Sequence, residues 1–472
     1  MSGPLEHPSE STAGSSCGCA GFTRSELMHA GAAKAGSGLP SIEAGMPVPA
    51  GTGLTRRSFI SRTAGLAMAV YGASALGTRA LEEGLAEAAA AGPSNAVLVS
   101  VFLSGGIDSL SVLAPTGDPN YATLRPSLAL TPAETLSFRD DPGLRWHASA
   151  AKLKALHEED KVTLFPAIGY ASPNQSHFTS RHYWEVGETN PAGRVGWMGR
   201  YLDQHGSNAN PLQGLALSPT LAPALATTVN PVAAVSRPET YTFPAPGVAA
   251  PMIAPMLDEM GALGGLASTD ATLQSARRAT AATAALRARV APFSSYTSPV
   301  AYPVTSNEFP KRLAALAAML AAGLPIKVVA VQAAGGYDTH SSQTASLPAN
   351  LLLVSDTLNA FQRDLESRGI ADRVLVHVWS EFGRRAKDNG SGTDHGAGGV
   401  SMLIGSKASK TMVGGFPGLA SGTGGGLDSQ QNLRATSDFR GLYCSLLQDW
   451  LNVDPAPIIP GAASLPRYAV VK

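Results

Sequence analysis

A short apolar segment that ends in glycines and an acidic residue decides the fold: Ala96-Val-Leu-Val-Ser-Val-Phe-Leu103 runs directly into Ser104-Gly-Gly-Ile-Asp108. Its apolar residues are continuous rather than alternating, which is typical of a strand buried on both faces. Four further runs share this character: Val162–Ile168, Ile326–Ala333, Val374–Trp379 and Val400–Ile404. The sequence therefore predicts a mostly parallel sheet that is covered by helices.

Helical patterns alternate with these strands, and this alternation predicts an α/β fold class, a three-layer sandwich with a mostly parallel central sheet. The predicted helices are His147–Glu158, Arg194–His205, Ala271–Ala291, Glu308–Ala322, Pro348–Ser367 and Asp438–Leu451. We expect one α/β domain over residues 92–472. Within it, residues from about 219 to 302 are rich in Ala, Pro and Thr, and we expect them to form a cap insertion.

The composition limits the classes of partner. The chain has 472 residues with 35 basic and 35 acidic side chains, so its net charge is zero. A nucleic-acid binder normally carries a basic excess, so we expect no nucleic-acid partner. Cysteine is scarce, with Cys17, Cys19 and Cys444. A fold that retains only Cys444 cannot depend on internal disulfides.

An export signal precedes the predicted domain. Residues 55–60, Thr-Arg-Arg-Ser-Phe-Ile, resemble the twin-arginine consensus, a mildly apolar run follows from Thr63 to Gly77, and small residues gather at 88–91. This order of charge, apolar run and small residues predicts a twin-arginine signal peptide over residues 55–91. The alternative is a chance Arg56-Arg57 pair before a core helix. We therefore expect a periplasmic or secreted protein that uses the twin-arginine translocase and has no permanent membrane anchor.

The lead before this signal is unusually long. Residues 1–54 are rich in Gly, Ser, Ala and Pro without periodicity, so we expect a disordered N-terminal extension. Translation from Met46, or from Met28 instead of Met1, would shorten the lead to an ordinary length. N-terminal sequencing of the unprocessed precursor decides between these starts.

Polar side chains follow each of the first four predicted strands. They are Asp108 after the first strand, Ser176 and His177 after the second, Asp338 and His340 after the third, and Glu381 and Arg384 after the fourth, with Asp394 and His395 in the next loop. In open α/β sheets, ligands bind beyond the carboxyl ends of the strands. Carboxylates and imidazoles without thiolates suit a divalent metal such as zinc or manganese. The sequence therefore predicts a metal or anion site at this edge.

Each of these residues also has a structural alternative. Asp108 and Ser176 are suited to cap helices, and Glu381 is suited to pair with Arg384 or Arg385. The other four candidate ligands, Asp338, His340, Asp394 and His395, are equally suited to solvated loops.

The same motifs carry a resemblance to a known family. The chain resembles the exported domain-of-unknown-function family 1501 in its Arg-Arg signal and in the segments Phe-Leu-Ser-Gly-Gly-Ile-Asp-Ser-Leu, Asn-Gln-Ser-His-Phe, Gly-Gly-Tyr-Asp-Thr-His, Ser-Glu-Phe-Gly-Arg and Thr-Asp-His-Gly. That family is similar to the alkaline phosphatase and sulfatase superfamily, whose members use a two-metal site at the carboxyl edge of the sheet. The resemblance extends over essentially the whole of residues 92–472.

The resemblance implies a role for each candidate residue. It implies Ser176 as the nucleophile and His177, Arg181 and Arg384 as substrate-binding residues. It implies the metal ligands Asp108, Asp338, His340, Glu381, Asp394 and His395, holding one or two ions. Glu381-Phe382 stands where the superfamily usually has Asp-His, so one imidazole is missing and the second ion is in question.

Two functions follow as expectations. The first is an exported, metal-dependent hydrolase of phosphate or sulfate esters, acting on a small-molecule or glycan ester, in which Ser176 attacks the ester. A formylglycine sulfatase is disfavoured because residues 176–181 lack the Cys/Ser-x-Pro-x-Arg pattern of that class. The alternative is a non-catalytic exported binding protein of the same fold with a degenerate metal site.

Overall fold

The computed structural model describes residues 46–48, 50, 70–71, 96–207, 210–236 and 248–472. Almost all of the predicted N-terminal extension and almost all of the predicted export signal lie outside these residues. Among the described residues, no helix is both long and apolar enough to cross a membrane. Cys444 is buried and not in a disulfide.

A large mixed sheet forms the centre of the molecule. Its order is β1-β8-β7-β9-β2-β10-β13-β6-β14 within the described residues. The strands are β1 (Val70–Tyr71), β2 (Val97–Phe102), β6 (Val162–Gly169), β7 (Gly214–Ala216), β8 (Val232–Ala234), β9 (Val328–Gln332), β10 (Val374–Trp379), β13 (Gly399–Ile404) and β14 (Ser437–Asp438). All five predicted strands are present, and their bounds agree to within a few residues.

Most neighbouring strands in this sheet are parallel. β10, β2, β9, β7 and β8 pair in parallel, as do β6 and β14, whereas β13 is antiparallel to both β10 and β6. The short β1 pairs antiparallel to β8 at the edge. The carboxyl ends of the parallel strands therefore meet the amino end of β13 along one edge.

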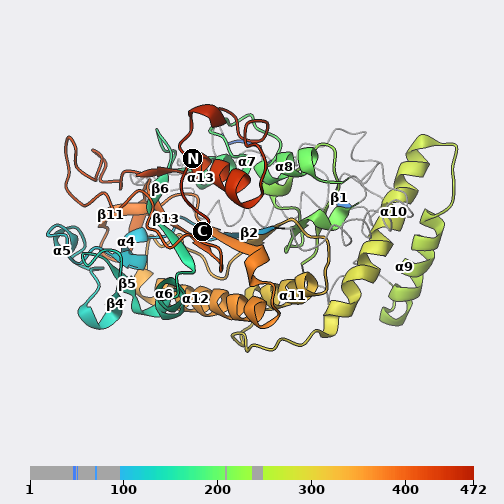
Figure 1. Cartoon of the computed structure of the whole chain (residues 1–472), viewed down its shortest axis with the longest axis horizontal. Helices are drawn as coiled ribbons and strands as arrows, with labels where there is room; N and C mark the ends of the chain where they lie inside the picture. Colours follow the sequence, from blue (N-terminus) through green and yellow to red (C-terminus); the bar gives the residue numbers. More distant parts are fainter. Residues whose placement is uncertain (1–45, 49, 51–69, 72–95, 208–209, 237–247) are drawn as a thin grey trace, which may run out of the picture.

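Helices cover both faces of the sheet, as Figure 1 shows. On one side lie α6 (Ala151–Glu158), α11 (Phe309–Ala321) and α12 (Gln343–Ser367). On the other side lie α7 (His177–Val186), α8 (Trp197–His205) and α13 (Phe439–Ser445), the last continuing as a π-helical turn over Leu446–Trp450. The predicted three-layer α/β sandwich is confirmed.

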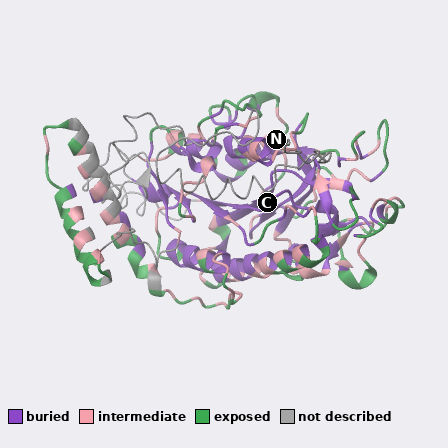
Figure 2. Cartoon of the chain, turned by 180° about the vertical axis from the view of Figure 1, so that it is seen from behind, coloured by how far each residue is buried: buried purple, intermediate pink, exposed green. Residues whose placement is uncertain are grey.

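The burial pattern explains why the central strands are apolar at every position. In β2, Val97, Val99 and Val101 pack into the core beneath α6, α11 and α12, whereas Leu98 and Phe102 pack into the core beneath α7, α8 and α13. Figure 2 shows the same division, with buried residues along the sheet and on the inward faces of the helices. A strand between two cores has no solvent face, so it does not alternate.

Smaller elements lie beyond one end of the sheet. They are α4 (Ser109–Val112), α5 (Tyr121–Leu124), the sheet of β3 (Leu113–Ala114), β5 (Arg145–His147) and β4 (Thr135–Ser137), and the hairpin of β11 (Arg384–Asp388) and β12 (Thr393–His395). The α4, α5 and β11 elements appear together at one end of Figure 1.

The predicted cap is wrong in part. Residues 219–302 include β8, which is a strand of the central sheet. They also include α9 (Ala250–Gly264) and α10 (Ala271–Val290), of which only the second was predicted. These two helices pack together at the opposite end of the molecule from α4, α5 and β11 in Figure 1, so they do not cover the elements around the site.

Candidate metal centre

Three loops at the carboxyl edge of the sheet bring distant residues together. His177 begins α7 after β6, Asp338 follows β9, and His395 ends β12, the strand that returns toward β13. One ligand atom from each of these three residues lies within 4.8 Å of the others. The sequence-based prediction of a site at this edge therefore has a structural counterpart in the described residues.

Three imidazoles converge on the carboxylate of Asp338. The Nε2 atoms of His177, His340 and His395 lie 3.5, 3.2 and 3.4 Å from its oxygens. The rings themselves are close, with centroids 4.3 Å apart for His177 and His395 and 4.8 Å for His340 and His395. His177, Asp338 and His395 thus offer two nitrogens and one carboxylate as a possible metal-binding group, and the Nε2 of His340, beside them, also lies 3.3 Å from the Arg384 guanidinium.

The other ring nitrogen of each histidine is held by an acceptor. The Nδ1 of His177 lies 2.7 Å from the Glu381 carboxylate, and that of His395 lies 2.8 Å from the carbonyl of Gln175. The Nδ1 of His340 lies 3.2 Å from Asp394. Because each of these partners accepts a hydrogen bond, Nδ1 of each ring carries a proton, and Nε2 is the nitrogen that faces Asp338. This arrangement is usual behind metal-binding histidines.

Burial and neighbouring charges set the protonation of the cluster. Burial alone would lower the pKa of His177, but hydrogen bonds to Asp338 and Glu381 raise it to about 9. Burial acts to raise the pKa of Asp338, but the three histidines and Arg384 hold it well below its usual value. Burial lowers the pKa of His395, an effect that Asp338 partly offsets. Asp338 is therefore ionised and His395 is neutral near pH 7, as metal ligands must be, whereas His177 carries a second proton at this pH that an ion would have to displace from Nε2.

The spacing of the ligand atoms fits a small divalent ion. A tetrahedral zinc site with bonds of about 2.0–2.1 Å places neighbouring ligand atoms roughly 3.3–3.4 Å apart. The separations of 3.2 to 3.5 Å between the imidazoles and Asp338 match this spacing. Nitrogen and carboxylate ligands without sulfur suit zinc or manganese. His177, Asp338 and His395 therefore form a possible site for one ion, with His340 beside them, and a second ion stays a prediction.

Glu381 is not placed as a ligand, contrary to the prediction. Its side chain is fully buried. One carboxylate oxygen accepts from His177 and from the backbone N–H of Gly105, and the other accepts from the Ser380 hydroxyl at 2.9 Å. Both oxygens are committed, so Glu381 orients His177 from behind. His177, in turn, was predicted to bind substrate and instead lies among the candidate ligands.

Arg384 is likewise not placed to bind substrate. Its side chain is buried, and its guanidinium donates to the Asp338 carboxylate and to the backbone carbonyls of Gly105, Gly106, Tyr337 and Thr393. Gly105 itself has φ +117°, and a Cβ there would lie 2.3 Å from the backbone nitrogen of Asp338. Gly105 thus permits the close approach of the Asp338 backbone rather than of an ion. Arg384 fixes the Asp338 carboxylate in place.

Asp108 is an ion-pair residue, and the prediction of a metal ligand is wrong for it. It is fully buried, and its two oxygens accept from both terminal nitrogens of Arg125. Ser111 and Gln343 donate to the same carboxylate. Although burial acts to raise the pKa of Asp108, the Arg125 guanidinium lowers it overall. The side chain does not cap α4 either.

Of the three remaining predicted residues, Ser176 and Arg181 belong to α7 or its N-cap, and Asp394 lies in β12. Ser176 is the N-cap residue of this helix, and its hydroxyl accepts from the backbone N–H of Thr179 at 3.5 Å. Arg181 donates to the Glu185 carboxylate at 2.9 Å, one turn further along α7. Its guanidinium also lies over the ring of Phe102, 4.6 Å from the centroid. Asp394, predicted as a ligand, lies behind His340 and also accepts from Asn389.

Sequence reasoning missed several residues that shape the site. Gln175 supplies the carbonyl that orients His395, and Phe382 packs against the rings of His177 and His395 at 4.9 and 5.0 Å. Gln343 donates to Asp108 and accepts from Thr393 on the hairpin. Because Phe382 directly follows Glu381, the sequence indicated that it would lie near the predicted site. No sequence pattern indicated a place near the site for Gln343.

The family comparison agrees with part of the earlier resemblance. Residues 266–421 match the model of a protein family described as a protein of unknown function, DUF1501. The DUF1501 match includes Asp338, His340 and His395, and it begins after His177. A search among curated proteins found no similar sequence.

Proposed function

We propose that this chain is an exported, metal-dependent hydrolase of phosphate or sulfate esters. The observation that carries the proposal is the convergence of three Nε2 atoms on the Asp338 carboxylate, each imidazole being fixed from behind at Nδ1. An ordinary cluster of solvated side chains does not need such fixed orientations, whereas a metal site does.

The cluster would hold one zinc or manganese ion. His177, Asp338 and His395 are the proposed ligands, which leaves room for a ligand that is not protein, as catalytic metal sites require. When bound, the ion would supply Lewis-acid polarisation of an ester oxygen. Arg384 keeps Asp338 in position, and Glu381 and the Gln175 carbonyl keep two of the imidazoles in the binding tautomer.

Ser176 is the proposed nucleophile. It directly precedes His177 and occupies the N-terminus of α7, a helix of ten residues. The backbone N–H groups and the dipole at such a terminus favour an anionic group, so a phosphate or sulfate is stabilised there. The mostly parallel sheet with its site at the carboxyl ends supports, by analogy only, a likeness to the alkaline phosphatase and sulfatase superfamily.

The proposed location is the periplasm or the exterior, reached through the twin-arginine translocase. The support for this is the sequence motif at residues 55–60, which lies outside the described residues. The proposal includes no nucleic-acid partner, because the chain has equal numbers of basic and acidic side chains.

A second candidate is a binding protein that needs no metal. The observation that favours it is the ion pair between Arg384 and Asp338, which already places a positive charge at the centre of the cluster. A guanidinium in this place neutralises Asp338 without an ion. The two candidates differ in whether the purified protein carries metal and turns over esters.

The deciding experiment measures turnover of 4-nitrophenyl phosphate and 4-nitrophenyl sulfate before and after dialysis against a chelator. We expect activity to be lost on dialysis and restored by zinc or manganese. The His395→Ala variant should be inactive under all conditions, whereas the control His205→Ala, at the end of α8, should behave like the wild type. Absence of turnover in the metal-loaded wild type would favour the binding protein.

A further inference from the structure

The carbonyl that orients His395 belongs to a residue that is itself held from a distant part of the chain. Gln175 directly precedes Ser176, and its backbone carbonyl accepts from Nδ1 of His395 at 2.8 Å. Its side-chain amide donates to the side-chain carbonyl of Asn432 at 3.0 Å, across 257 positions of the chain. Gln175 therefore links the ring of His395 to Asn432.

Asn432 lies in a turn that is fixed by its own hydrogen bonds. The side-chain NH2 of Asn432 donates to the Asp428 carboxylate at 2.9 Å. This carboxylate also accepts from the backbone N–H groups of Gln430 and Asn432 at 2.8 and 2.9 Å. Arg434 donates through Nε to the carbonyl of Leu427 at 3.2 Å, which joins the two ends of the turn. The Asn432 amide is thus a fixed point to which the Gln175 side chain bonds.

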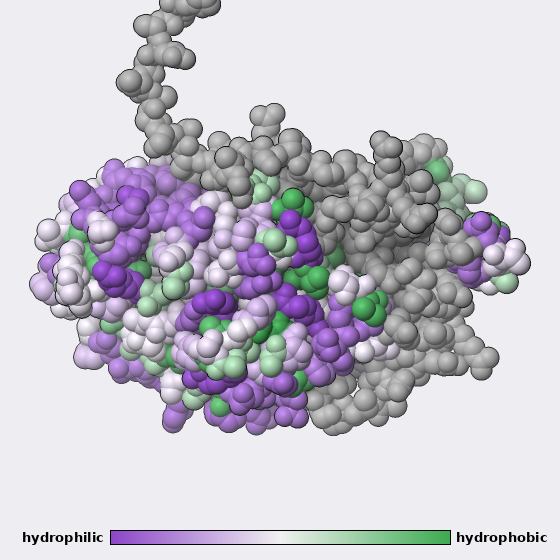
Figure 3. Space-filling view, turned by 90° about the horizontal axis from the view of Figure 1, so that it is seen from above, coloured by the Kyte–Doolittle hydropathy of each residue, from purple (hydrophilic) through white to green (hydrophobic). Residues whose placement is uncertain are grey.

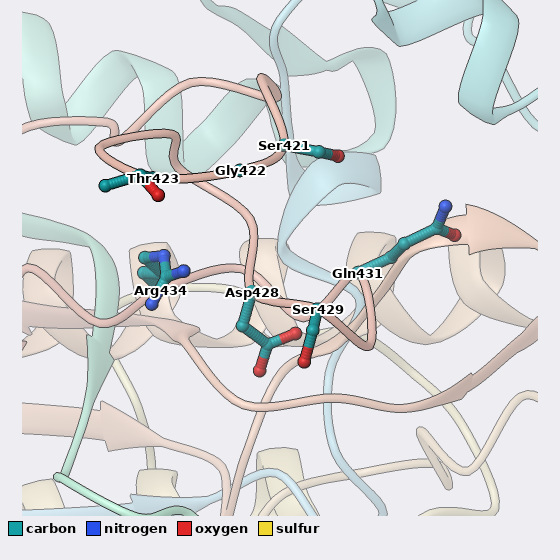
Figure 4. Close-up of a pocket in the computed structure, with 7 residues that line it drawn as sticks. All are labelled: Ser421, Gly422, Thr423, Asp428, Ser429, Gln431 and Arg434. Carbon is teal, nitrogen blue, oxygen red and sulfur yellow. The ribbon is translucent and has the colours of Figure 1, made fainter.

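The other side chains of this turn lie around a hollow, as Figure 4 shows. The residues that line the hollow are Ser421, Gly422, Thr423, Asp428, Ser429, Gln431 and Arg434. Asn432 is not among them and is buried, with 1% of its surface exposed. Its side chain is directed into the protein toward Gln175 rather than into the hollow.

The same turn also pairs with the hairpin that carries His395. The backbone of Asn432 forms an antiparallel bridge with β11, and the N–H of Ala386 in β11 donates to the carbonyl of Gln431 at 3.0 Å. The strand β11 pairs with β12, which ends at His395. The contacts therefore form a closed circuit from the turn through the hairpin to His395, and through Gln175 back to the turn.

We propose that Asn432 is a positioning residue for the metal centre, acting through Gln175 on His395. The inference rests on the proposed function, because it assigns the residue that holds one of the proposed ligands in place. Without the Asn432 amide the circuit is open, and the Gln175 carbonyl is free to rotate away from Nδ1 of His395. The Nε2 of His395 then faces Asp338 for less of the time, which weakens metal binding although no ligand is removed.

The test measures the zinc affinity of the purified protein by titration against a competing chelator. Asn432→Ala should lower the affinity about tenfold, the lower end of what the loss of an orienting partner costs. Gln175→Met keeps the backbone carbonyl but removes the amide donor, so it should lower the affinity by a similar factor. The double variant should bind no more weakly than either single variant, because both changes remove the same contact. Losses that add in the double variant would contradict the proposal.

Asn210→Ala is the matched control for a general loss of stability. Asn210 is equally buried, with 1% exposed, and it accepts from the N–H of Leu212 and donates to the carbonyl of Pro325. These contacts lie at the amino ends of β7 and β9, the opposite edge of the sheet from the cluster. The control should unfold at lower urea concentration but keep the zinc affinity of the wild type. An unchanged affinity in Asn432→Ala, or an equal loss in Asn210→Ala, would overturn the proposal.

Failure of the proposed function gives a different result. If the wild type binds neither zinc nor manganese, the proposed function fails, and proton NMR of the imidazole N–H groups then tests Asn432 alone. The Nδ1–H of His395, bonded to the Gln175 carbonyl, should give a downfield signal that moves or disappears in Asn432→Ala but not in Asn210→Ala. The same signal in the wild type and in both variants would contradict a positioning role for Asn432.

Discussion

His177 shows how one side chain of the possible metal-binding group is held in a single orientation. Glu381 holds its Nδ1 from behind at 2.7 Å, while its Nε2 faces Asp338. Glu381 is itself held by the Gly105 N–H and the Ser380 hydroxyl, so the carboxylate has no freedom to turn away. The position of the imidazole is therefore fixed before any ion binds, which lowers the cost of ordering the site.

We predict that Glu381→Gln weakens metal binding without unfolding the protein. The amide keeps the size of the side chain but removes the charge that orients His177. Loss of such an orienting partner typically costs 10- to 100-fold in metal affinity. Titration against a competing chelator measures the change. An affinity equal to that of the wild type would show that Glu381 does not orient a ligand.

The role of Ser176 is separable from its capping of α7. We expect Ser176→Ala to abolish turnover, to keep the metal, and to lose about 1 kcal/mol of stability through the missing cap. The matched variant Ser176→Asn retains a capping side chain but has no nucleophilic hydroxyl. It should be as stable as the wild type and equally inactive. Activity in Ser176→Asn, measured as ester turnover, would leave Ser176 with a structural role only.

At the residue scale, the sequence predicted the edge of the sheet at which the possible metal-binding group lies, but not the role of each residue. Asp338 and His395 were predicted as ligands and belong to that group, whereas His340 lies beside it. Whether a residue binds the ion or stands behind a ligand depends on contacts over long stretches of chain, such as His177 with Glu381, which are 204 residues apart. Spacing in the sequence contains no information on such contacts.

At the scale of elements, buried polar contacts join the hairpin of β11 and β12 to the sheet. Gln343, the first residue of α12, donates to Asp108 and accepts from the hydroxyls of Thr339 and Thr393. Arg125 completes this group through Asp108 and through the carbonyl of Ala386 in β11. The hairpin that carries His395 is therefore positioned by groups that do not touch the cluster.

We predict that Asp108→Asn is strongly destabilising, because it leaves the buried Arg125 without its counter-charge. Breaking one side of a buried ion pair costs about 3–5 kcal/mol. The control Asp372→Asn removes one partner of an exposed pair with Lys407 and should cost less than about 1 kcal/mol. Urea unfolding measures both. A small effect of Asp108→Asn on stability, together with loss of metal from the folded protein, would show that Asp108 is a metal ligand after all.

The elements that sequence reasoning missed are those with weak patterns. The strands β7, Gly-Leu-Ala, and β8, Val-Ala-Ala, are three residues long and consist mostly of small residues, so they lack the bulky apolar run that marks the others. Helix α12 begins at Gln343 rather than at the predicted Pro348, because proline favours the first turn but is tolerated here inside the helix. The long apolar strands were predictable because a strand that is buried on both faces needs apolar residues at nearly every position.

At the scale of the whole molecule, buried histidines make stability depend on pH. Burial lowers the pKa of His377 to about 3, below the ordinary value of 6.5. The unfolded chain therefore binds a proton that the folded chain excludes as the pH falls below 6.5. The contribution of His377 to stability is present above pH 6.5 and is lost as the pH falls toward 3, at about 1.4 kcal/mol per pH unit.

We predict that His377→Gln flattens this dependence by about that amount per pH unit. Urea unfolding at several pH values between 5 and 7.5 measures the slope. The control Ser401→Ala removes the hydroxyl that lies 3.1 Å from Nε2 of His377 but leaves the titrating ring, so the slope should stay as in the wild type. An unchanged slope in His377→Gln would mean that the buried ring does not control acid stability.

On the face seen in Figure 3, hydrophilic residues predominate over the described part of the surface, and apolar residues form few large areas there. The chemistry is instead gathered at the carboxyl edge of the sheet, where β6, β9 and the hairpin of β11 and β12 deliver His177, Asp338 and His395. The central claim is that these residues, with His340 beside them, bind one divalent metal ion.

X-ray absorption spectroscopy on protein purified without chelator tests this claim most directly. The account predicts about one zinc or manganese ion per chain, with imidazole scattering from at least two histidines and no sulfur; for zinc, the bonds to nitrogen and oxygen should be about 2.0–2.1 Å. The Asp338→Asn variant should lose the signal. Protein without metal, or metal whose spectrum lacks imidazole, would contradict the account.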